Sequence, residues 1–465
     1  MAKWLGRKLE RVFLVGSFTG FLLLLSMQVV GNGRVKLEPN FTRDNEAKYS
    51  RRTCETGGDN TSQLRATVNT TFSVSHKVTG YLIAFRYYEQ QTQALRNYLQ
   101  FQCLGNSFGM RIVEPFIRKS FFSFPFDELL AGRNLLQLGD LIDLDLWNQQ
   151  TTSKFGFPPV SSWINFLKSA PKKIIIGCIK YRDTHHIRPP SPGFDYRMGC
   201  PRECFNSFNR SLTFLRNYGF QLVRRVCANF VDFGGTVTVD KFLADLTGKF
   251  KPKNVTILLN EFRGLFGLTR LPVLSECGIR HHKTEISINP SAIIMKDAKR
   301  YVFSVFHNQP YIAILVRVER VVLHLHRNIT TCAKNLRNLL DDLYKTHKID
   351  KYFLAMDVGK FGSQGSTANH LQPHGMVIFN AVYKRTWTFE TWEESCLKYA
   401  SNDNPAYIAN LQRAIAAMSQ CFIMVGEGGF QAQARALYQR LHPETTSWCI
   451  HKICGEYTVD HSTIK

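Results

Sequence analysis

The hydrophobic positions of the chain form short apolar runs that alternate with amphipathic stretches from residue 79 onward. Residues 80–85 (GYLIAF) and 110–116 (MRIVEPF) predict buried strands, and residues 89–108 between them place leucines at helical spacing. A strand, a helix and a strand in this order form a βαβ unit with parallel strands. The pattern then continues with a strand, a helix and two further strands, predicted over residues 174–179, 205–218, 220–227 and 255–259.

A second alternating block opens near residue 290. Its predicted strands and helices cover residues 311–318 (strand), 332–346 (helix), 352–358 (strand), 404–418 (helix), 421–425 (strand) and 430–440 (helix). Two such blocks predict an α/β fold with two Rossmann-like domains facing a cleft, the first over residues 79–290 and the second over residues 291–465.

The first 78 residues follow a different pattern. Residues 12–30 (VFLVGSFTGFLLLLSMQVV) carry no charge, and a helix of that length spans about 28 Å, enough to cross a bilayer core. Basic residues precede this run, so the positive-inside rule predicts a single-pass type II anchor, with residues 1–11 as a cytoplasmic tail and the rest luminal. A cleaved signal peptide is the alternative. The polar residues 31–78 predict a flexible, glycosylated stem.

Composition narrows the class of partner. A hydrophobic content of 44% excludes wholesale disorder, and 59 Lys and Arg against 36 Asp and Glu give a net charge of +23. This balance favours anionic partners, namely nucleic acid, phosphate esters, anionic lipid or acidic glycans. The predicted luminal topology argues against nucleic acid and leaves phosphate esters and acidic glycans as the better matches.

Cysteines and glycosylation sequons agree with a protein of the Golgi or endoplasmic reticulum membrane. All twelve cysteines lie beyond residue 30, and their even number permits disulfides in an oxidising compartment. The pairs Cys200/Cys204 and Cys449/Cys454 are close enough in sequence to close local loops, while free buried thiols are the alternative for some cysteines. Asn-x-Ser/Thr sequons predict N-glycosylation at Asn40, Asn60, Asn69, Asn209, Asn254 and Asn328.

Two predicted strand ends in the second block carry residues suited to a diphosphate. Arg317 ends one strand, with Glu319 two residues later on the same side of an extended chain. A glycine turn at a helix N-terminus presents free N–H groups, and an arginine opposite it can hold the same diphosphate as charge develops. A solvated strand end and an ordinary βα turn are the alternatives. The turn and helix start that follow the last strand comprise Gly426, Gly428, Gly429, Phe430 and Gln431.

Residues 311–320 (YIAILVRVER) resemble the arginine-bearing strand of the O-fucosyltransferase-like superfamily. The resemblance implies a GT-B fold and GDP-fucose as donor. It also implies that Arg317 is the arginine that binds the donor diphosphate and that Glu319 is the acidic residue of the same family motif. Residues 421–431 resemble the family's final strand and turn, which close over the nucleotide. Leu315 stands where the family has histidine, and Gly429 where it often has serine or threonine.

The family resemblance also supplies candidates outside this strand. Residues 80–116 resemble the family's opening strand, loop, helix and strand. Some protein O-fucosyltransferases place a catalytic glutamate in that loop, which implies Glu89 as the base beside the acceptor hydroxyl. A glutamate that complements the helix dipole is the alternative. Arg86 is predicted as a phosphate or acceptor contact, and Asp357, at a strand end, as a contact to sugar or ribose or as a loop cap.

Residues 140–147 (DLIDLDLW) allow three interpretations. They resemble an Asp-rich segment of the same family, and Asp143 and Asp145 are then acceptor-side contacts. A DxD pair also binds nucleotide sugars through a metal ion in metal-dependent transferases. A short capped helix is the structural alternative. The histidine pairs of the chain lack a third ligand, so we predict no metal site and no cofactor.

These features predict a glycosyltransferase that moves fucose from GDP-fucose to a protein or glycan hydroxyl with inversion. Its expected partners are the nucleotide sugar, a glycoprotein or glycan acceptor, and the membrane through one N-terminal helix, with no nucleic acid. Two alternatives stay open: a non-catalytic luminal glycan-binding protein that retains the fold, and a metal-dependent transferase that uses Asp143 and Asp145.

Overall fold

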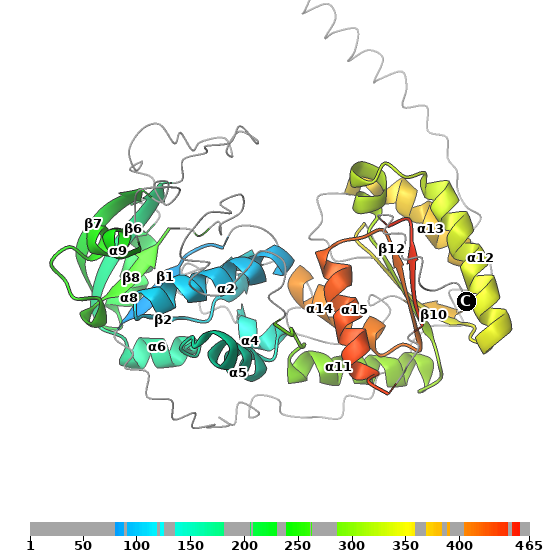
Figure 1. Cartoon of the computed structure of the whole chain (residues 1–465), viewed down its shortest axis with the longest axis horizontal. Coiled ribbons are helices and arrows are strands. Elements are labelled where there is room, and N and C mark those ends of the chain that lie inside the picture. The colour runs from blue at the N-terminus through cyan, green and yellow to red at the C-terminus, as the bar shows by residue number, and fades with distance from the viewer. Residues whose placement is uncertain are drawn as a thin grey trace, which may run out of the picture. The chain divides into compact units, whose positions relative to one another are not determined.

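The computed structural model describes most of the chain beyond residue 79 (Figure 1). The predicted tail, anchor and stem at residues 1–78 lie outside the described residues. Within the described part, no helix combines the length and the apolar composition that a bilayer crossing needs. The described residues are 80–87, 91–118, 121–124, 135–180, 205, 208–229, 239–260, 262, 286–358, 369–383, 388–390, 404–444 and 449–455.

Five parallel strands form the first sheet, in the order β2-β1-β8-β6-β7. The two central strands β1 and β8 are buried along their whole length, which explains why they read as continuous apolar runs. The strand predicted over 110–116 is shorter than expected, because Val113 leaves the sheet and pairs with Ser161. The strands are β1 (Tyr81–Ala84), β2 (Arg111–Ile112), β6 (Lys173–Lys180), β7 (Gln221–Asn229) and β8 (Thr256–Leu259).

The helices of the first half connect these strands in the expected βα alternation. The predicted helix over 89–108 is confirmed as α2, and the helix predicted over 205–218 is shorter, as α8. The helices are α2 (Gln91–Ser107), α6 (Trp163–Ser169), α8 (Asn209–Arg216) and α9 (Val239–Thr247).

Five parallel strands also form the second sheet, in the order β11-β10-β9-β12-β13. The strand predicted over 311–318 ends two residues early, because the chain turns into a short π-helix after Val316. Thus both predicted parallel sheets are present. The strands are β9 (Ile312–Val316), β10 (Lys351–Met356), β11 (Thr388–Glu390), β12 (Cys421–Val425) and β13 (Ile450–Ile453).

Helices cover both faces of the second sheet (Figure 1). Side chains of β9 alternate between two cores: Ile312 and Ile314 pack with α12 and α13, whereas Ala313 and Leu315 pack with α11, α14 and α15. This alternation follows from the two-residue period of a strand. The helices are α11 (Ala292–Phe306), α12 (Ile329–His347), α13 (Gln372–Tyr383), α14 (Pro405–Ala417) and α15 (Gly429–Leu441).

A small antiparallel sheet and two short helices complete the described fold. The sheet has the order β4-β3-β5, with β3 (Phe116–Arg118), β4 (Phe121–Ser123) and β5 (Leu136–Gln137). The segment rich in aspartate forms α4 (Leu138–Leu141) and α5 (Leu144–Phe155), so the capped-helix interpretation describes its local structure.

Disulfides link distant parts of the second half. Cys332 bonds to Cys454 and Cys421 bonds to Cys449, and no described cysteine is free. The predicted local pair Cys449/Cys454 is therefore wrong, and so is the expectation of free thiols among the described cysteines. The two residues flank β13, and five residues of extended chain span about 16 Å, far beyond the 4.4–6.8 Å between the Cα atoms of bonded cysteines.

Candidate functional site

Three neighbouring strands of the second sheet end together at one edge. Val316 pairs with Met356 of β10 on one side and with Val425 of β12 on the other. The backbone N–H of Arg317 donates to the Val425 carbonyl at 2.9 Å, and that of Asp357 donates to the Val316 carbonyl at 3.3 Å. The residues that follow these strands therefore emerge side by side at the carboxyl edge, where open parallel sheets bind ligands.

The Arg317 side chain is held in place by a carboxylate. Its Nε donates to Asp357 Oδ2 at 3.0 Å, while Asp357 Oδ1 accepts a hydrogen bond from the Val318 amide at 2.8 Å. Burial raises the pKa of Asp357, and Arg317 and the Val318 amide oppose this rise by stabilising the charged form. Asp357 thus orients the guanidinium through Nε and leaves the two Nη groups for other partners.

Glu319 makes a looser contact with the same arginine. Its Oε2 lies 3.8 Å from Arg317 Nη2, and both side chains are 26% exposed. The extended geometry that was expected to align these two residues is absent, because Glu319 has helical backbone angles (φ −56°, ψ −43°) and caps the π-helix Arg320–His324. A pair at this separation and exposure contributes little to stability and is free to rearrange around a ligand.

The glycine turn after β12 lies next to this guanidinium. Gly426 has φ +81°, and a Cβ there would lie 2.9 Å from the Arg317 carbonyl oxygen, so only glycine fits without a shift. A Cβ at Gly428 would lie 3.6 Å from Arg317 Nη1, in ordinary contact. The structure therefore brings the arginine and the glycine turn together, as the sequence predicted.

The turn leads into the N-terminus of α15, a helix of 13 residues. Its N-cap is Gly428, which gives no side-chain hydrogen bond, so the first amides of the helix keep their hydrogens for another acceptor. Partial positive charge from the helix dipole adds to the charge of Arg317 at the same place. Such a pairing is chemically suited to a diphosphate.

One of the predicted nucleotide contacts, Gln431, points away from this position. Gln431 is 1% exposed, and its Nε2 donates to the carbonyls of Leu315 and Val425, both at 3.0 Å. Phe430 packs against the apolar core. The Gln431 side chain therefore holds α15 against the sheet and is not placed to bind a nucleotide, whereas Phe430 is half-buried.

Sequence reasoning overlooked a second cation at the site. Arg320 Nε would lie 3.8 Å from a Cβ at Gly428, so it approaches the helix start together with Arg317. The two arginines converge because the chain becomes helical after β9, and residues three apart share one face of a helical turn. The spacing of the two arginines in RVER (residues 317–320) could have indicated Arg320 as a site residue. That inference would have required knowing that the strand ends at Val316.

Asp143 and Asp145 lie elsewhere. Both are exposed and line a cavity of about 460 Å³ together with Leu437 and Leu441 of α15. These leucines are eight and twelve residues beyond Gly429, or about 12 and 18 Å along the helix. Asp143 is the N-cap of α5, where its side chain accepts from the Leu146 amide at 3.0 Å. The two aspartates therefore do not join the Arg317 site.

The structure describes only part of the surroundings of the candidate residues in the first half. Glu89 lies outside the described residues, two positions before the start of α2. Arg86 is exposed, and its carbonyl accepts from the Phe262 amide at 2.8 Å. Among the predicted glycosylation sites, Asn209, Asn254 and Asn328 are exposed, and Asn40, Asn60 and Asn69 lie outside the described residues.

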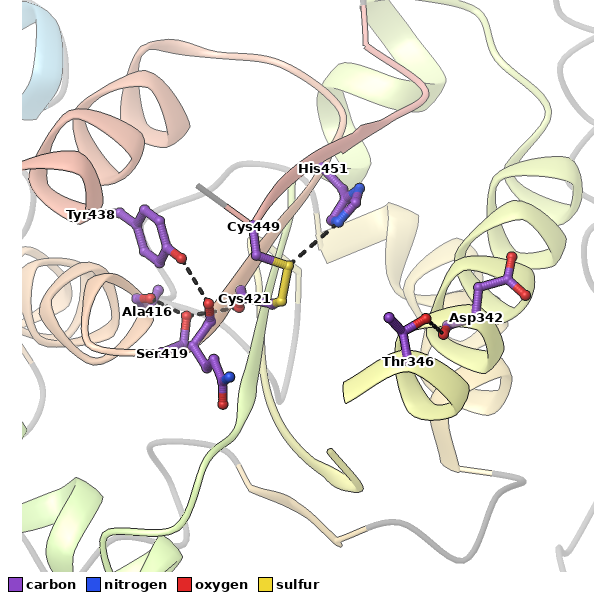
Figure 2. Close-up of a disulfide and its surroundings, with 9 residues drawn as sticks. Asp342, Thr346, Ala416, Ser419, Cys421, Tyr438, Cys449 and His451 are labelled. Atoms are coloured by element: carbon purple, nitrogen blue, oxygen red, sulfur yellow. Dashed lines mark hydrogen bonds between the residues drawn. A yellow bond between two sulfur atoms is a disulfide. The ribbon is translucent and has the colours of Figure 1, made fainter. Parts of the chain in front are cut away.

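One described cluster has the spacing of metal ligands. Ligand atoms of His347, Cys421 and Cys449 lie within 4.8 Å of one another. The two sulfurs form a disulfide, so neither is a thiolate in this state, and Figure 2 shows His451 directed at the Cys449 sulfur, 3.5 Å away. Burial and the nearby His347 lower the pKa of His451.

Solved structures similar to this chain include those of POFUT1, an O-fucosyltransferase. The structure of POFUT1 in complex with GDP matches with 12% identity and a TM-score of 0.44, over 81% of this chain and 99% of that chain. The structure in complex with GDP-fucose matches with 12% identity and a TM-score of 0.45, over 81% and 98%. No protein-family model matches the sequence, and no curated protein matches it. The similarity to O-fucosyltransferases is therefore a distant one.

Proposed function

We propose that the protein is an inverting glycosyltransferase that takes fucose from GDP-fucose. The observation that carries the proposal is the Arg317 guanidinium, held by Asp357 beside the glycine start of α15. The motif resemblance of residues 311–320 supplies the identity of the donor. The donor diphosphate would lie between Arg317, Arg320 and the first amides of α15.

This geometry suits the departure of GDP. As the bond between the anomeric carbon and the β-phosphate oxygen breaks, its electron pair leaves on GDP, and two guanidinium groups and a helix N-terminus stabilise the charge. The acceptor oxygen forms the new bond from the opposite face and gives its proton to a base. Glu89 stays our candidate for that base.

The same proposal includes a type II membrane topology with the catalytic part in the lumen. The uncharged residues 12–30 and their basic flank support the anchor. The disulfides Cys332–Cys454 and Cys421–Cys449 support an oxidising compartment, because such bonds are rare in the cytosol.

Donor turnover in the presence of EDTA tests the proposal. Release of GDP from GDP-fucose should continue with EDTA, fall about 1,000-fold in Arg317→Ala, and stay within about twofold in Arg435→Ala. Arg435 lies on the same helix, more than one turn from its N-terminus, and controls for loss of positive charge. Equal activity of Arg317→Ala and the wild type would overturn the proposal.

One observation favours a second function, that of a glycan-binding protein without turnover. Leu315 occupies the family's histidine position, and it is 2% exposed in the core on the α14 and α15 side of the sheet. That position therefore supplies no polar group to the site. Tight binding of GDP with no turnover of any nucleotide sugar would support this second function.

A further inference from the structure

The edge of the first sheet at which its strands begin carries a set of cations that the proposed transfer reaction does not use. It is formed by residues 108–111, 168–173, 216–221 and 248–256, where α2, α6, α8 and α9 lead into β2, β6, β7 and β8. We call this set of segments the basic edge. Its cations are Arg111, Lys168, Lys172, Lys173, Arg216, Lys249, Lys251 and Lys253.

Hydrogen bonds tie these segments to one another. The Gln221 amide donates to the Lys172 carbonyl at 2.7 Å, and Thr256 Oγ1 donates to the Pro171 carbonyl at 2.9 Å. Tyr81 links β1 to the end of α6 through its hydroxyl, 3.0 Å from Ser169 Oγ. The basic edge is thus one continuous surface, and at about 4.8 Å between strands it spans about 19 Å.

The charge of this surface is of one sign. The four segments contain no Asp or Glu, and the nearby described acid is Asp245 in the last turn of α9. Lys168 and Arg216 complement the C-terminal dipoles of their own helices. Helix dipoles do not explain the exposed Lys173 and Lys251, because Lys173 begins β6 and Lys251 precedes the short 3-10 helix Pro252–Asn254.

Lys172 shows how the surface is built. Its Nζ donates to the Leu167 carbonyl at 2.7 Å and lies 4.2 Å from the centre of the Phe220 ring. This lysine is used internally, whereas Lys168, Lys173, Lys251 and Lys253 are exposed. The exposed set concentrates like charges at a cost in self-repulsion that an anionic partner would relieve.

We propose that the basic edge binds a linear sulfated polysaccharide. Several cations on a surface about 19 Å wide match a chain with repeated anionic groups better than one small anion. Tyr218, 45% exposed between Arg216 and Gln221, offers a ring for contact with a sugar face. The disulfides favour a compartment where sulfated glycans occur and nucleic acids do not.

An anionic membrane surface matches the same segments less well. Membrane-surface binding combines basic residues with exposed apolar side chains that enter the interface. In these four described segments, Tyr218 is the one exposed large side chain with an apolar body. Because the edge lies where the strands begin, it is also separate from the opposite edge of this sheet, where ligands of parallel sheets bind.

Heparin binding by matched variants tests the proposal. The edge variant carries Gln at Lys168, Lys173, Lys251 and Lys253, and the control variant carries Gln at the exposed Lys296, Lys299, Lys334 and Lys345 of the second half, so both lose the same charge. We expect the affinity for a heparin oligosaccharide at physiological salt to fall at least tenfold in the edge variant and less than twofold in the control. Both variants should keep the wild-type melting temperature and GDP affinity.

Three results would overturn the proposal. Equal losses of heparin affinity in both variants would mean that net charge alone drives binding. An unchanged heparin affinity in the edge variant would mean that the basic edge does not bind heparin. Vesicles rich in phosphatidylserine that bind as tightly as heparin, with the same loss in the edge variant, would replace the polysaccharide with a membrane. Because GDP affinity is measured on the same samples, failure here is distinguishable from failure of the proposed transfer reaction.

Discussion

The Arg317 site and the basic edge both concentrate positive charge at a sheet edge, but they build it differently. The Arg317 guanidinium is held by a carboxylate beside a glycine turn, whereas Lys251 and Lys253 are exposed at the start and within a short 3-10 helix. An oriented guanidinium recognises one diphosphate geometry, while exposed ammonium groups can bind any dense anionic chain. Preorganisation, and not the number of cations, therefore separates a candidate catalytic site from a docking surface.

The largest expected effect is the loss of Arg317. Arg317→Ala should weaken GDP binding about 1,000-fold, or about 4 kcal/mol, and Arg317→Lys should lose most of it too, since an ammonium group cannot make two parallel hydrogen bonds. Heparin affinity of both variants should stay unchanged. Calorimetry with GDP and with a heparin oligosaccharide measures both affinities. An equal loss of affinity for the two ligands would show that the two sites are not separate.

Removal of the Cys421–Cys449 disulfide should separate stability from binding. The double variant Cys421→Ala/Cys449→Ala opens a loop of 28 residues and should lower the free energy of unfolding by about 3 kcal/mol. The bond lies where β12 begins, at the opposite end of that strand from Gly426, so GDP affinity should change less than twofold. Denaturant titration and calorimetry measure the two quantities. A large loss of GDP affinity would show that the two edges of this sheet are coupled.

Gly426→Ala should damage the Arg317 site through its backbone. The new Cβ would press on the Arg317 carbonyl at a positive φ, which we expect to cost about 2 kcal/mol of stability and about tenfold in GDP affinity. Gly156→Ala is the matched control, because Gly156 also has a positive φ (+68°) but no atom near its Cβ position. Similar effects of the two variants on GDP binding would argue against a role of the Gly426 turn in positioning Arg317.

The smallest expected effect concerns pH. Burial raises the pKa of Asp357 above its usual value of 3.8, so the folded state binds more protons than the unfolded state just above that pH. Stability should therefore fall as pH rises through this window, and Asp357→Asn should remove that part of the slope. Chemical denaturation across pH 3.5–7 measures it. An unchanged slope would mean that Asp357 is already well solvated.

The sequence predicted both parallel sheets because their central strands are buried on two faces and read as apolar runs. It also predicted that Arg317 meets the turn at Gly428, since both follow strands that were expected to end at one edge. The sequence did not indicate Arg320, because no hydrophobic period predicts the π-helix that follows β9. It misplaced Gln431, whose inward orientation depends on how α15 packs on the sheet.

Other details depended on three-dimensional separations that a local pattern does not contain. The partners of Cys449 and Cys454 follow from the placement of β13 beside β12, which sends the two cysteines to opposite ends of a strand. Asp143 is the N-cap of α5 at a cavity that the far end of α15 also lines, and its role as an acceptor contact stays a prediction.

A structure of the protein with GDP bound would show whether Arg317 and the start of α15 hold the diphosphate. We predict that the diphosphate oxygens accept hydrogen bonds from the Arg317 guanidinium and from the first amides of α15, with Asp357 still bonded to Arg317 Nε. GDP bound elsewhere, for example in the cavity beside Asp143, with no ligand beside Arg317 and Gly428, would rule out this diphosphate site.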